Sequence, residues 1–165
     1  MASTLFKGNP VHTNGNLPAV GSKAPAFTLV GADLSEKSLS DFSGQTVVLT
    51  INPSYDTGVC QATARRFNTE LSKKAGVAVL MISADLPFAQ KRFCSAEGIE
   101  GIIPLSTFRS TFAKDYGLEL VDGPLKGVTA RAVIVVDPSG QVKYSQLVDE
   151  ITTEPSYDSV LAVVG

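Results

Sequence analysis

The chain has 165 residues, 44% of them hydrophobic and 18% charged, which is enough to build one domain with a buried core. Its 14 basic and 16 acidic residues give a net charge of −2, so nothing in the composition indicates binding to nucleic acid or to an anionic membrane. The N-terminus lacks a basic segment followed by an apolar one, and the longest apolar run, residues 77–82, is too short to span a bilayer. We therefore expect a single cytoplasmic domain, residues 1–165.

Metal binding is not expected from the two cysteines and the single histidine. His12 stands between the turn formers Pro10 and Asn14, which predicts an exposed loop. Cys60 and Cys94 are far apart in sequence and cannot close a four-ligand zinc site. The sequence therefore predicts no metal and no other cofactor.

The first third of the chain predicts short strands. Residues 3–6 and 11–13 flank a Gly-Asn-Pro turn at 8–10, the pattern of an N-terminal hairpin. Residues 26–30 predict a strand, and residues 38–42 predict a short turn-like element.

A buried strand and an amphipathic helix follow. Residues 47–51 form a continuous β-branched run, as expected of a central strand that is covered on both faces. From Cys60 the period becomes helical, and Gly76 is expected to end this helix as its C′ residue. The residues on its apolar face are Cys60, Ala64, Phe67 and Leu71.

The next segment alternates between strand and helix. Residues 77–82 predict a second buried strand. Asp85 before Pro87 is a helix-start signal, so residues 87–96 should form a short helix that stops at Gly98. Residues 107–116 predict another helical stretch.

The C-terminal part predicts a hairpin and a last helix. Residues 132–136 and 142–148 are strand-like and flank the Asp-Pro-Ser-Gly turn at 137–140, and a helix is expected to begin near Pro155. Strands that alternate with helices favour an α/β fold with a central mixed sheet and flanking helices. The arrangement is thioredoxin-like, with a β-hairpin added at the N-terminus.

The segment from Pro53 to Cys60 is the best candidate for a reactive site. Cys60 lies in the first turn of its predicted helix, where backbone amides and the helix dipole favour a thiolate. Thr57 is predicted as the N-cap, and its hydroxyl could reach the sulfur or an oxygen bound to it. Pro53 is predicted to end the preceding strand.

A reactive thiol in a partly apolar position needs a cation nearby, because burial alone opposes its ionisation. Arg131 opens the buried strand 132–136 and could be brought beside the Cys60 helix at the end of the sheet. Arg65 and Arg66 are alternatives one turn further on, although both are expected on a solvated helix face.

Cys94 is the only possible partner thiol within the chain. Its distance from Cys60 in sequence excludes a C-x-x-C dithiol. A direct bond needs Cα atoms within about 7 Å, which for two separate helices requires local unwinding. A nucleophilic thiol with one distant partner thiol indicates redox turnover. A thiol–disulfide oxidoreductase and a redox-responsive binding protein without catalytic turnover would both be compatible with this pair.

The motif P-x-x-x-T-x-x-C at Pro53, Thr57 and Cys60 resembles the peroxidatic motif of the peroxiredoxins. Longer strings resemble the bacterial thiol peroxidase branch of that family, of the atypical two-cysteine type. These strings, in chain order, are residues 56–60, 82–90, 92–94, 122–126, 130–132 and 145–155. Asn52 and Tyr55 are variable positions around the motif, and we expect neither residue to take part in the roles of the site residues.

The resemblance implies a thioredoxin fold and a thiol-dependent peroxidase that reduces hydrogen peroxide and alkyl hydroperoxides. Cys60 would be oxidised to a sulfenic acid, and Cys94 would resolve it as an intramolecular disulfide. Thr57 and Arg131 would orient the peroxide, and Pro53 would shield the sulfur. Thioredoxin would reduce the disulfide, and the protein would be a homodimer.

Overall fold

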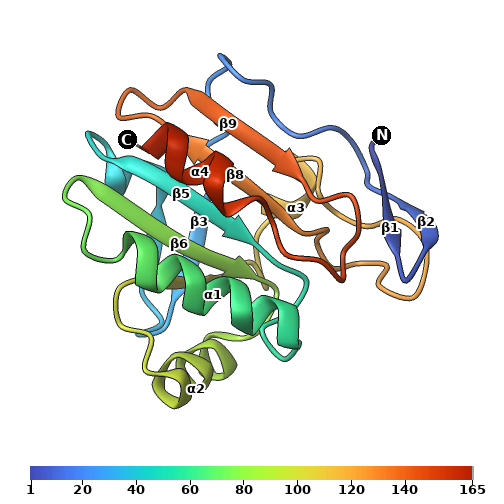
Figure 1. Ribbon diagram of the computed structural model, residues 1–165, viewed down its shortest axis with the longest axis horizontal. Coiled ribbons are helices and arrows are strands. Elements are labelled where there is room, and N and C mark those ends of the chain that lie inside the picture. The colour runs from blue at the N-terminus through green and yellow to red at the C-terminus, as the bar shows by residue number, and fades with distance from the viewer. Residues whose placement is uncertain (165) are drawn as a thin grey trace.

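The computed structural model describes residues 1–164 (Figure 1). Its elements are β1 (Ser3–Phe6), β2 (Asn9–His12), β3 (Thr28–Gly31), β4 (Glu36–Ser38), the 3₁₀ helix η1 (Leu39–Phe42), β5 (Thr46–Ile51), α1 (Gly58–Leu71), β6 (Val77–Ser83), α2 (Pro87–Glu97), β7 (Ile103–Ser106), α3 (Phe112–Asp115), β8 (Ala132–Val136), β9 (Val142–Leu147) and α4 (Tyr157–Val164).

A mixed sheet forms the centre, with the strand order β4-β3-β7-β6-β5-β8-β9. Strand β5 lies between a parallel neighbour, β6, and an antiparallel neighbour, β8. All its residues after Thr46 are buried, which explains its uninterrupted apolar and β-branched sequence. Strands β1 and β2 form a separate antiparallel hairpin, on the side where β5 and β6 end and α1 begins (Figure 1).

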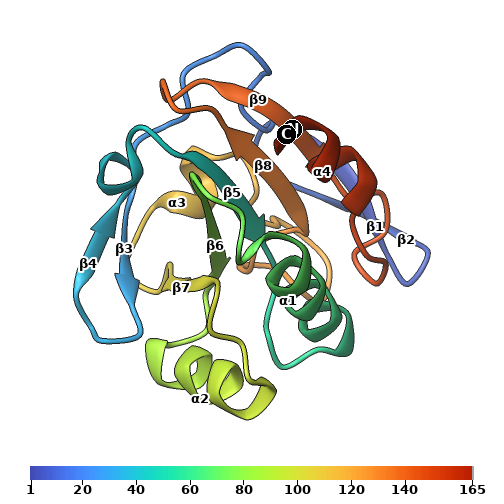
Figure 2. The same ribbon diagram turned by 60° about the vertical axis from the view of Figure 1, so that its left-hand side comes forward.

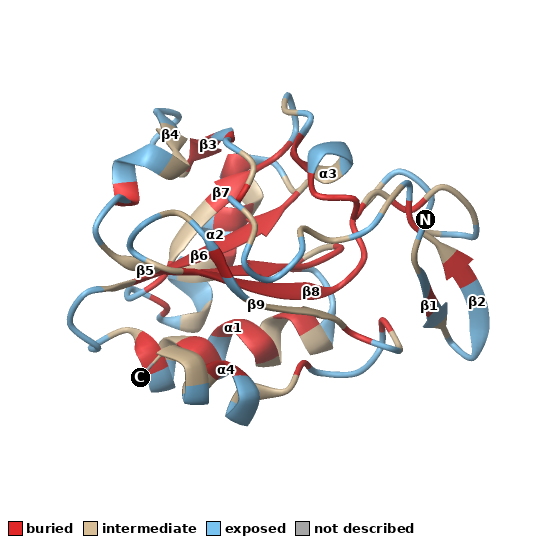
Figure 3. Ribbon diagram, turned by 90° about the horizontal axis from the view of Figure 1, so that it is seen from above, coloured by how far each residue is buried: buried red, intermediate tan, exposed pale blue. Residues whose placement is uncertain are grey.

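The two faces of the sheet carry separate parts of the core. Helices α1, α2 and α4 contribute Phe67, Phe93 and Val160 to one part. The other part contains Phe112 of α3 and Tyr116, whose rings stack at 4.3 Å. Figures 2 and 3 show α1 and α4 together on one side of the strands and α3 on the other. The thioredoxin-like fold with flanking helices and an N-terminal hairpin is therefore confirmed.

Two expected boundaries differ from the structure in the helical half. Helix α1 ends at Leu71 with Ser72 as its C-cap, so Gly76 is not its C′ residue. Gly76 instead has φ 73° in the turn before β6, a backbone conformation that glycine adopts without strain. At α2 the expected stop is confirmed, since Gly98 caps it in the left-handed conformation.

Other expectations were wrong. The stretch 107–116 is helical only over Phe112–Asp115, because Thr107 and Ser110 instead form a turn through their backbone groups. Strands β4 and β7 were not predicted. His12 lies in β2 rather than in a loop, and its Nδ1 is 2.7 Å from the carboxylate of Asp122.

Among the described residues, no helix has both the length and the apolar character needed to cross a membrane.

Candidate active site

Cys60 lies in the first turn of α1, directly beyond the end of the central strand β5. Thr57 is the N-cap of this helix, and its Oγ1 accepts a hydrogen bond from the Cys60 amide at 3.4 Å. The same hydroxyl donates to the Ser54 carbonyl at 3.1 Å, so it shapes the loop before the helix as well. Cys60 is fully buried on the apolar face of α1, Pro53 is buried, and Thr57 is exposed. The start of the helix therefore favours negative charge at an otherwise enclosed sulfur.

Arg131 is the cation at this sulfur. Its Nη1 lies 3.2 Å from Cys60 Sγ, although it precedes β8 and is far from Cys60 in sequence. The guanidinium is almost fully buried, and its Nε donates to the Ile151 carbonyl at 2.8 Å. Arg65 and Arg66 lie on the solvent face of α1 and pair with glutamates instead, at 2.9 Å and 3.0 Å.

Asn52 and Tyr55 take part in the same buried network, which corrects the expectation that they would not touch the site. Asn52 Oδ1 accepts from Arg131 Nη1 at 2.8 Å, and Asn52 Nδ2 donates to the Tyr55 hydroxyl at 2.5 Å. Burial raises the pKa of Tyr55 well above its usual range, and the nearby Cys60 raises it further, so the phenol stays neutral. The signal in the sequence was that both residues carry polar groups and lie beside the reactive segment. Polar groups that become buried need hydrogen-bond partners, which here are the other members of this network.

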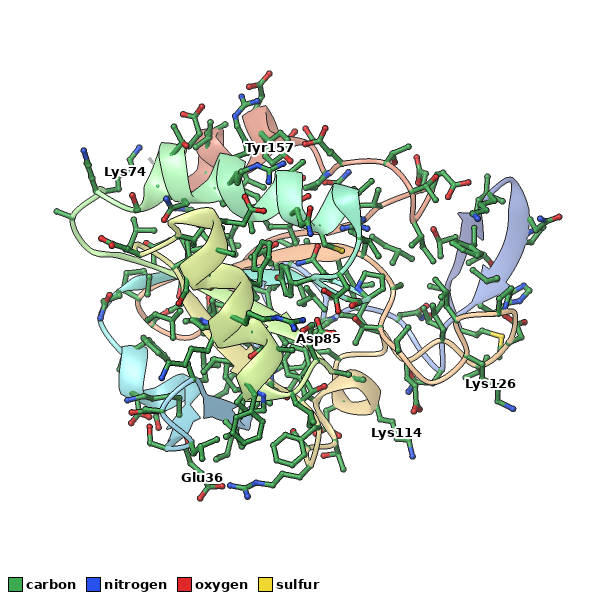
Figure 4. All side chains as sticks on the ribbon, turned by 90° about the horizontal axis from the view of Figure 1, so that it is seen from below. Glu36, Lys74, Asp85, Lys114, Lys126 and Tyr157 are labelled. Atoms are coloured by element: carbon green, nitrogen blue, oxygen red, sulfur yellow. The ribbon has the colours of Figure 1, made fainter. Side chains whose placement is uncertain are left out.

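The loop before α1 is fastened to the end of β6 by Asp85. Its carboxylate accepts from the Ser54 hydroxyl at 2.8 Å, from the Tyr55 amide at 2.7 Å and from the Ser83 hydroxyl at 2.8 Å. Asp85 was expected to mark the start of α2, but the N-cap of that helix is Leu86. Figure 4 shows Asp85 close to α2 in the interior of that view, whereas Lys74 and Lys126 are at its edges.

A pocket of about 380 Å³ has Arg131 in its wall, and Arg131 in turn contacts the Cys60 sulfur. Several segments that are far apart in the sequence form its wall, and most of the lining surface is apolar. The residues are Phe6, Lys7, Pro53, Ser54, Thr57, Gly58, Val59, Leu125, Val128, Arg131, Ile151 and Thr152. The site thus combines a charged end with an apolar wall.

The N-terminal hairpin is part of this wall, and Glu150 holds it in place. The Glu150 carboxylate accepts from the amides of Gly8 at 2.8 Å, Lys7 at 3.3 Å and Thr152 at 3.0 Å. Backbone hydrogen bonds, chiefly from Thr152 and then from Gly8, lower the pKa of Glu150. The carbonyl of the next residue, Ile151, accepts a hydrogen bond from Arg131. One short segment, residues 150–151, therefore binds both the hairpin and the arginine.

Cys94 lies on α2, in a different environment. It is partly buried, packs against the same core part as Cys60, and is a free thiol, as Cys60 also is. Burial raises the pKa of Cys94 from 9.0 to about 11, so it is protonated at neutral pH. The neighbouring residue, Phe93, packs its ring on Tyr55 at 5.4 Å between centroids.

This fold and site define a class: a thioredoxin-like protein with a single cysteine at a helix start, bound to a buried arginine. The family model described as Redoxin matches residues 19–161. The chain is 54% identical to a thiol peroxidase of Corynebacterium glutamicum, over all of both chains. It is 50% identical to a thiol peroxidase of Mycobacterium tuberculosis, over 100% of this chain and 99% of that one.

Solved structures agree with the sequence relatives. A peroxiredoxin-like protein from Aquifex aeolicus matches with a TM-score of 0.95 and 41% identity, over 99% of this chain and 96% of that one. A thiol peroxidase from Chromobacterium violaceum shares the fold, with a TM-score of 0.87 at 24% identity over 98% and 94% of the two chains. The chain belongs to the thiol peroxidases of the redoxin family and is a peroxiredoxin-type, thiol-dependent peroxidase.

Replacing Glu150 with Ala should impair large peroxides more than hydrogen peroxide. The substitution frees the hairpin tip, so Phe6 no longer completes the apolar wall. We expect KM for cumene hydroperoxide to rise about fourfold, the factor that one buried methylene contributes to binding. Steady-state kinetics with both peroxides measures this. Asp149→Ala is the control, because Asp149 is an exposed neighbour whose side chain takes no part in the hydrogen bonds of Glu150. An equal loss for both peroxides would contradict the assignment of the hairpin to the pocket wall.

The alkylation of Cys94 should depend on pH in a way that reports its burial. Iodoacetamide reacts with thiolates, so a raised pKa protects the thiol at neutral pH. In the folded, reduced protein we expect the labelling rate of Cys94 to rise with a midpoint near pH 11, whereas in denaturant the midpoint should return to about 9. Mass mapping of the Cys94 peptide across pH measures both. A midpoint near 9 in the folded protein would show that the thiol is solvated.

Proposed function

We propose that Cys60 is the peroxidatic residue and that it reduces hydrogen peroxide and alkyl hydroperoxides by way of a sulfenic acid. The observation that supports this most directly is the 3.2 Å contact between Cys60 Sγ and Arg131 Nη1 at the end of the pocket. A guanidinium at that distance favours the thiolate, which is the nucleophilic form. The sulfur attacks one peroxide oxygen, an S–O bond forms, and the O–O bond breaks. The attacked oxygen becomes the hydroxyl of the sulfenic acid, and the other oxygen takes up a proton from solvent and leaves as water or an alcohol.

Three residues around the sulfur have distinct roles in this step. Arg131 stabilises negative charge on the sulfur and on the departing oxygen, because its guanidinium reaches both the sulfur and the pocket. Thr57 orients the bound peroxide from the exposed side, in addition to capping α1. Pro53 is buried, lines the pocket without an amide hydrogen, and shields the sulfenic acid from water.

Cys94 resolves the sulfenic acid. Its sulfur attacks Cys60 Sγ, a disulfide forms within the chain, and the hydroxyl of the sulfenic acid leaves as water with the thiol proton. The two residues lie on separate helices, α1 and α2, so this step requires local unwinding. Unwinding also exposes Cys94 to water, which removes the burial that opposes its ionisation.

The substrate class follows from the wall of the pocket. Phe6, Val59, Leu125, Val128 and Ile151 supply apolar surface around the charged end, which suits the carbon chain of an alkyl hydroperoxide. Hydrogen peroxide needs only the charged end. Both substrates therefore fit, and the alkyl compounds gain additional binding energy.

The remaining assignments concern the protein in its cellular setting. We assign it to the cytoplasm as one domain, residues 1–165, that forms a homodimer and is recycled by thioredoxin. Thioredoxin suits the proposed product, because an intramolecular disulfide is the type of bond that a dithiol reductant opens.

The two-cysteine cycle is tested by mass mapping after one equivalent of cumene hydroperoxide. Wild-type protein should yield a Cys60–Cys94 linkage within one chain. The Cys94→Ser variant should instead yield Cys60 as sulfenic acid, because peroxide is still reduced but nothing resolves the product. If Cys60 stays reduced, or if only Cys94 is oxidised, the proposed mechanism is wrong.

Recycling is tested separately by NADPH consumption with thioredoxin, thioredoxin reductase and hydroperoxide. We expect continuous turnover with wild-type protein and none with Cys60→Ser. The Cys94→Ser variant should complete about one turnover and then stop, since its product lacks the disulfide. Reduction of insulin disulfides without peroxide consumption would favour a thiol–disulfide oxidoreductase instead.

A further inference from the structure

Tyr55 connects the peroxide-reducing site to the helix that carries Cys94. The residue is 2% exposed, and its two ends have different partners. Its hydroxyl accepts from Asn52 Nδ2 at 2.5 Å, and its ring lies 5.4 Å from the Phe93 ring with 32° between the planes. Phe93 immediately precedes Cys94 on α2.

The hydroxyl end governs the orientation of Arg131. The side-chain amide of Asn52 has an oxygen and a nitrogen. The nitrogen donates to the Tyr55 hydroxyl at 2.5 Å and, at the longer distance of 3.3 Å, to Thr50 Oγ1. The oxygen end therefore faces Arg131 Nη1, at 2.8 Å, and that same nitrogen contacts Cys60 Sγ at 3.2 Å. If the amide turned over, two hydrogen-bond donors would face each other in a buried space.

The ring end restrains α2. The backbone amide of Tyr55 is bound by Asp85, two residues before α2, so the segment around Tyr55 is attached to that helix at its start and at Phe93. Aromatic pairs of this kind add stability beyond the area they bury. To bring Cys94 to Cys60, α2 must unwind near Phe93, and this contact must break.

We propose that Tyr55 is a positioning residue that couples the two chemical steps: its hydroxyl holds the Asn52–Arg131 pair on Cys60 during peroxide reduction, and its ring restrains α2 until Cys60 is oxidised. Oxidation adds an oxygen to a sulfur that is fully buried against Arg131, so the Arg131–Asn52–Tyr55 chain has to shift. This shift loosens the ring from Phe93 and frees Cys94 for attack on the sulfenic acid. The inference rests on the proposed function of the two cysteines.

The test uses two substitutions that each remove one end of the connection. Tyr55→Phe keeps the ring and removes the hydroxyl, and Phe93→Leu keeps an apolar side chain of similar size and removes the ring pair. Single-turnover stopped-flow of the reduced, full-length protein with cumene hydroperoxide follows the oxidation of Cys60, and quenched samples follow disulfide formation by mass.

The two variants should affect opposite steps. For Tyr55→Phe we expect Cys60 oxidation to slow about three- to tenfold, the range of one net hydrogen bond, with its pH profile moved to higher pH. Disulfide formation should keep its rate. For Phe93→Leu we expect an unchanged first step, disulfide formation about two- to tenfold faster, and less Cys60 sulfinic acid under excess peroxide.

Phe88→Leu is the matched control, because Phe88 is an exposed phenylalanine on the same helix, and it should change neither rate. Unfolding midpoints of all three variants establish that they are folded. An unchanged pH profile in Tyr55→Phe, or unchanged disulfide formation in Phe93→Leu, would overturn the coupling while the two-cysteine cycle of the wild type stands. Failure of wild-type protein to form the disulfide would overturn the proposed function, and the coupling with it.

Discussion

The buried contact between Arg131 and Cys60 is the interaction on which the site depends. A guanidinium that is 2% exposed has lost most of its hydration, a loss that costs several kcal/mol unless the charge is paired and its donors are satisfied. Its partners here are the Ile151 carbonyl, the Asn52 side chain and the Cys60 sulfur. The Cys60 sulfur is the partner that the proposed mechanism uses as an anion. In that mechanism the arginine and the thiolate stabilise each other.

The rest of the fold can be understood as the means of bringing these two groups together. The antiparallel pairing of β5 with β8 places Ile51 opposite Ala132, so Asn52 and Arg131 leave the sheet side by side. The start of α1 returns Cys60 to the same edge. The segment around Ile151 closes the site from outside, and Glu150 ties that segment to the N-terminal hairpin. The hairpin is small, but it helps to hold the segment that binds the buried Arg131.

The sequence predicted those features of the site that depend on local chemistry. Thr57 as N-cap, Cys60 on the apolar face of α1 and the buried strands β5 and β8 all follow from patterns within a few residues. Asn52 and Tyr55 were missed because their partners lie across the sheet or on another helix. Strand β7 was missed because Pro104 lies within it, and proline argues against a strand that is paired on both sides. In β7 that pairing is only partial, since two of its four residues pair with β3.

The two cysteines show how one fold can place the same side chain in two different electrostatic environments. Cys60 is fully buried beside a cation and a helix start, whereas Cys94 is less buried and burial alone raises its pKa. In the proposed cycle this difference matters, because a protonated Cys94 would not attack Cys60 until α2 opens. The packing around α2 would then keep the second thiol inert until the first has reacted. Tyr55 lies where that packing meets the contact between Arg131 and Cys60.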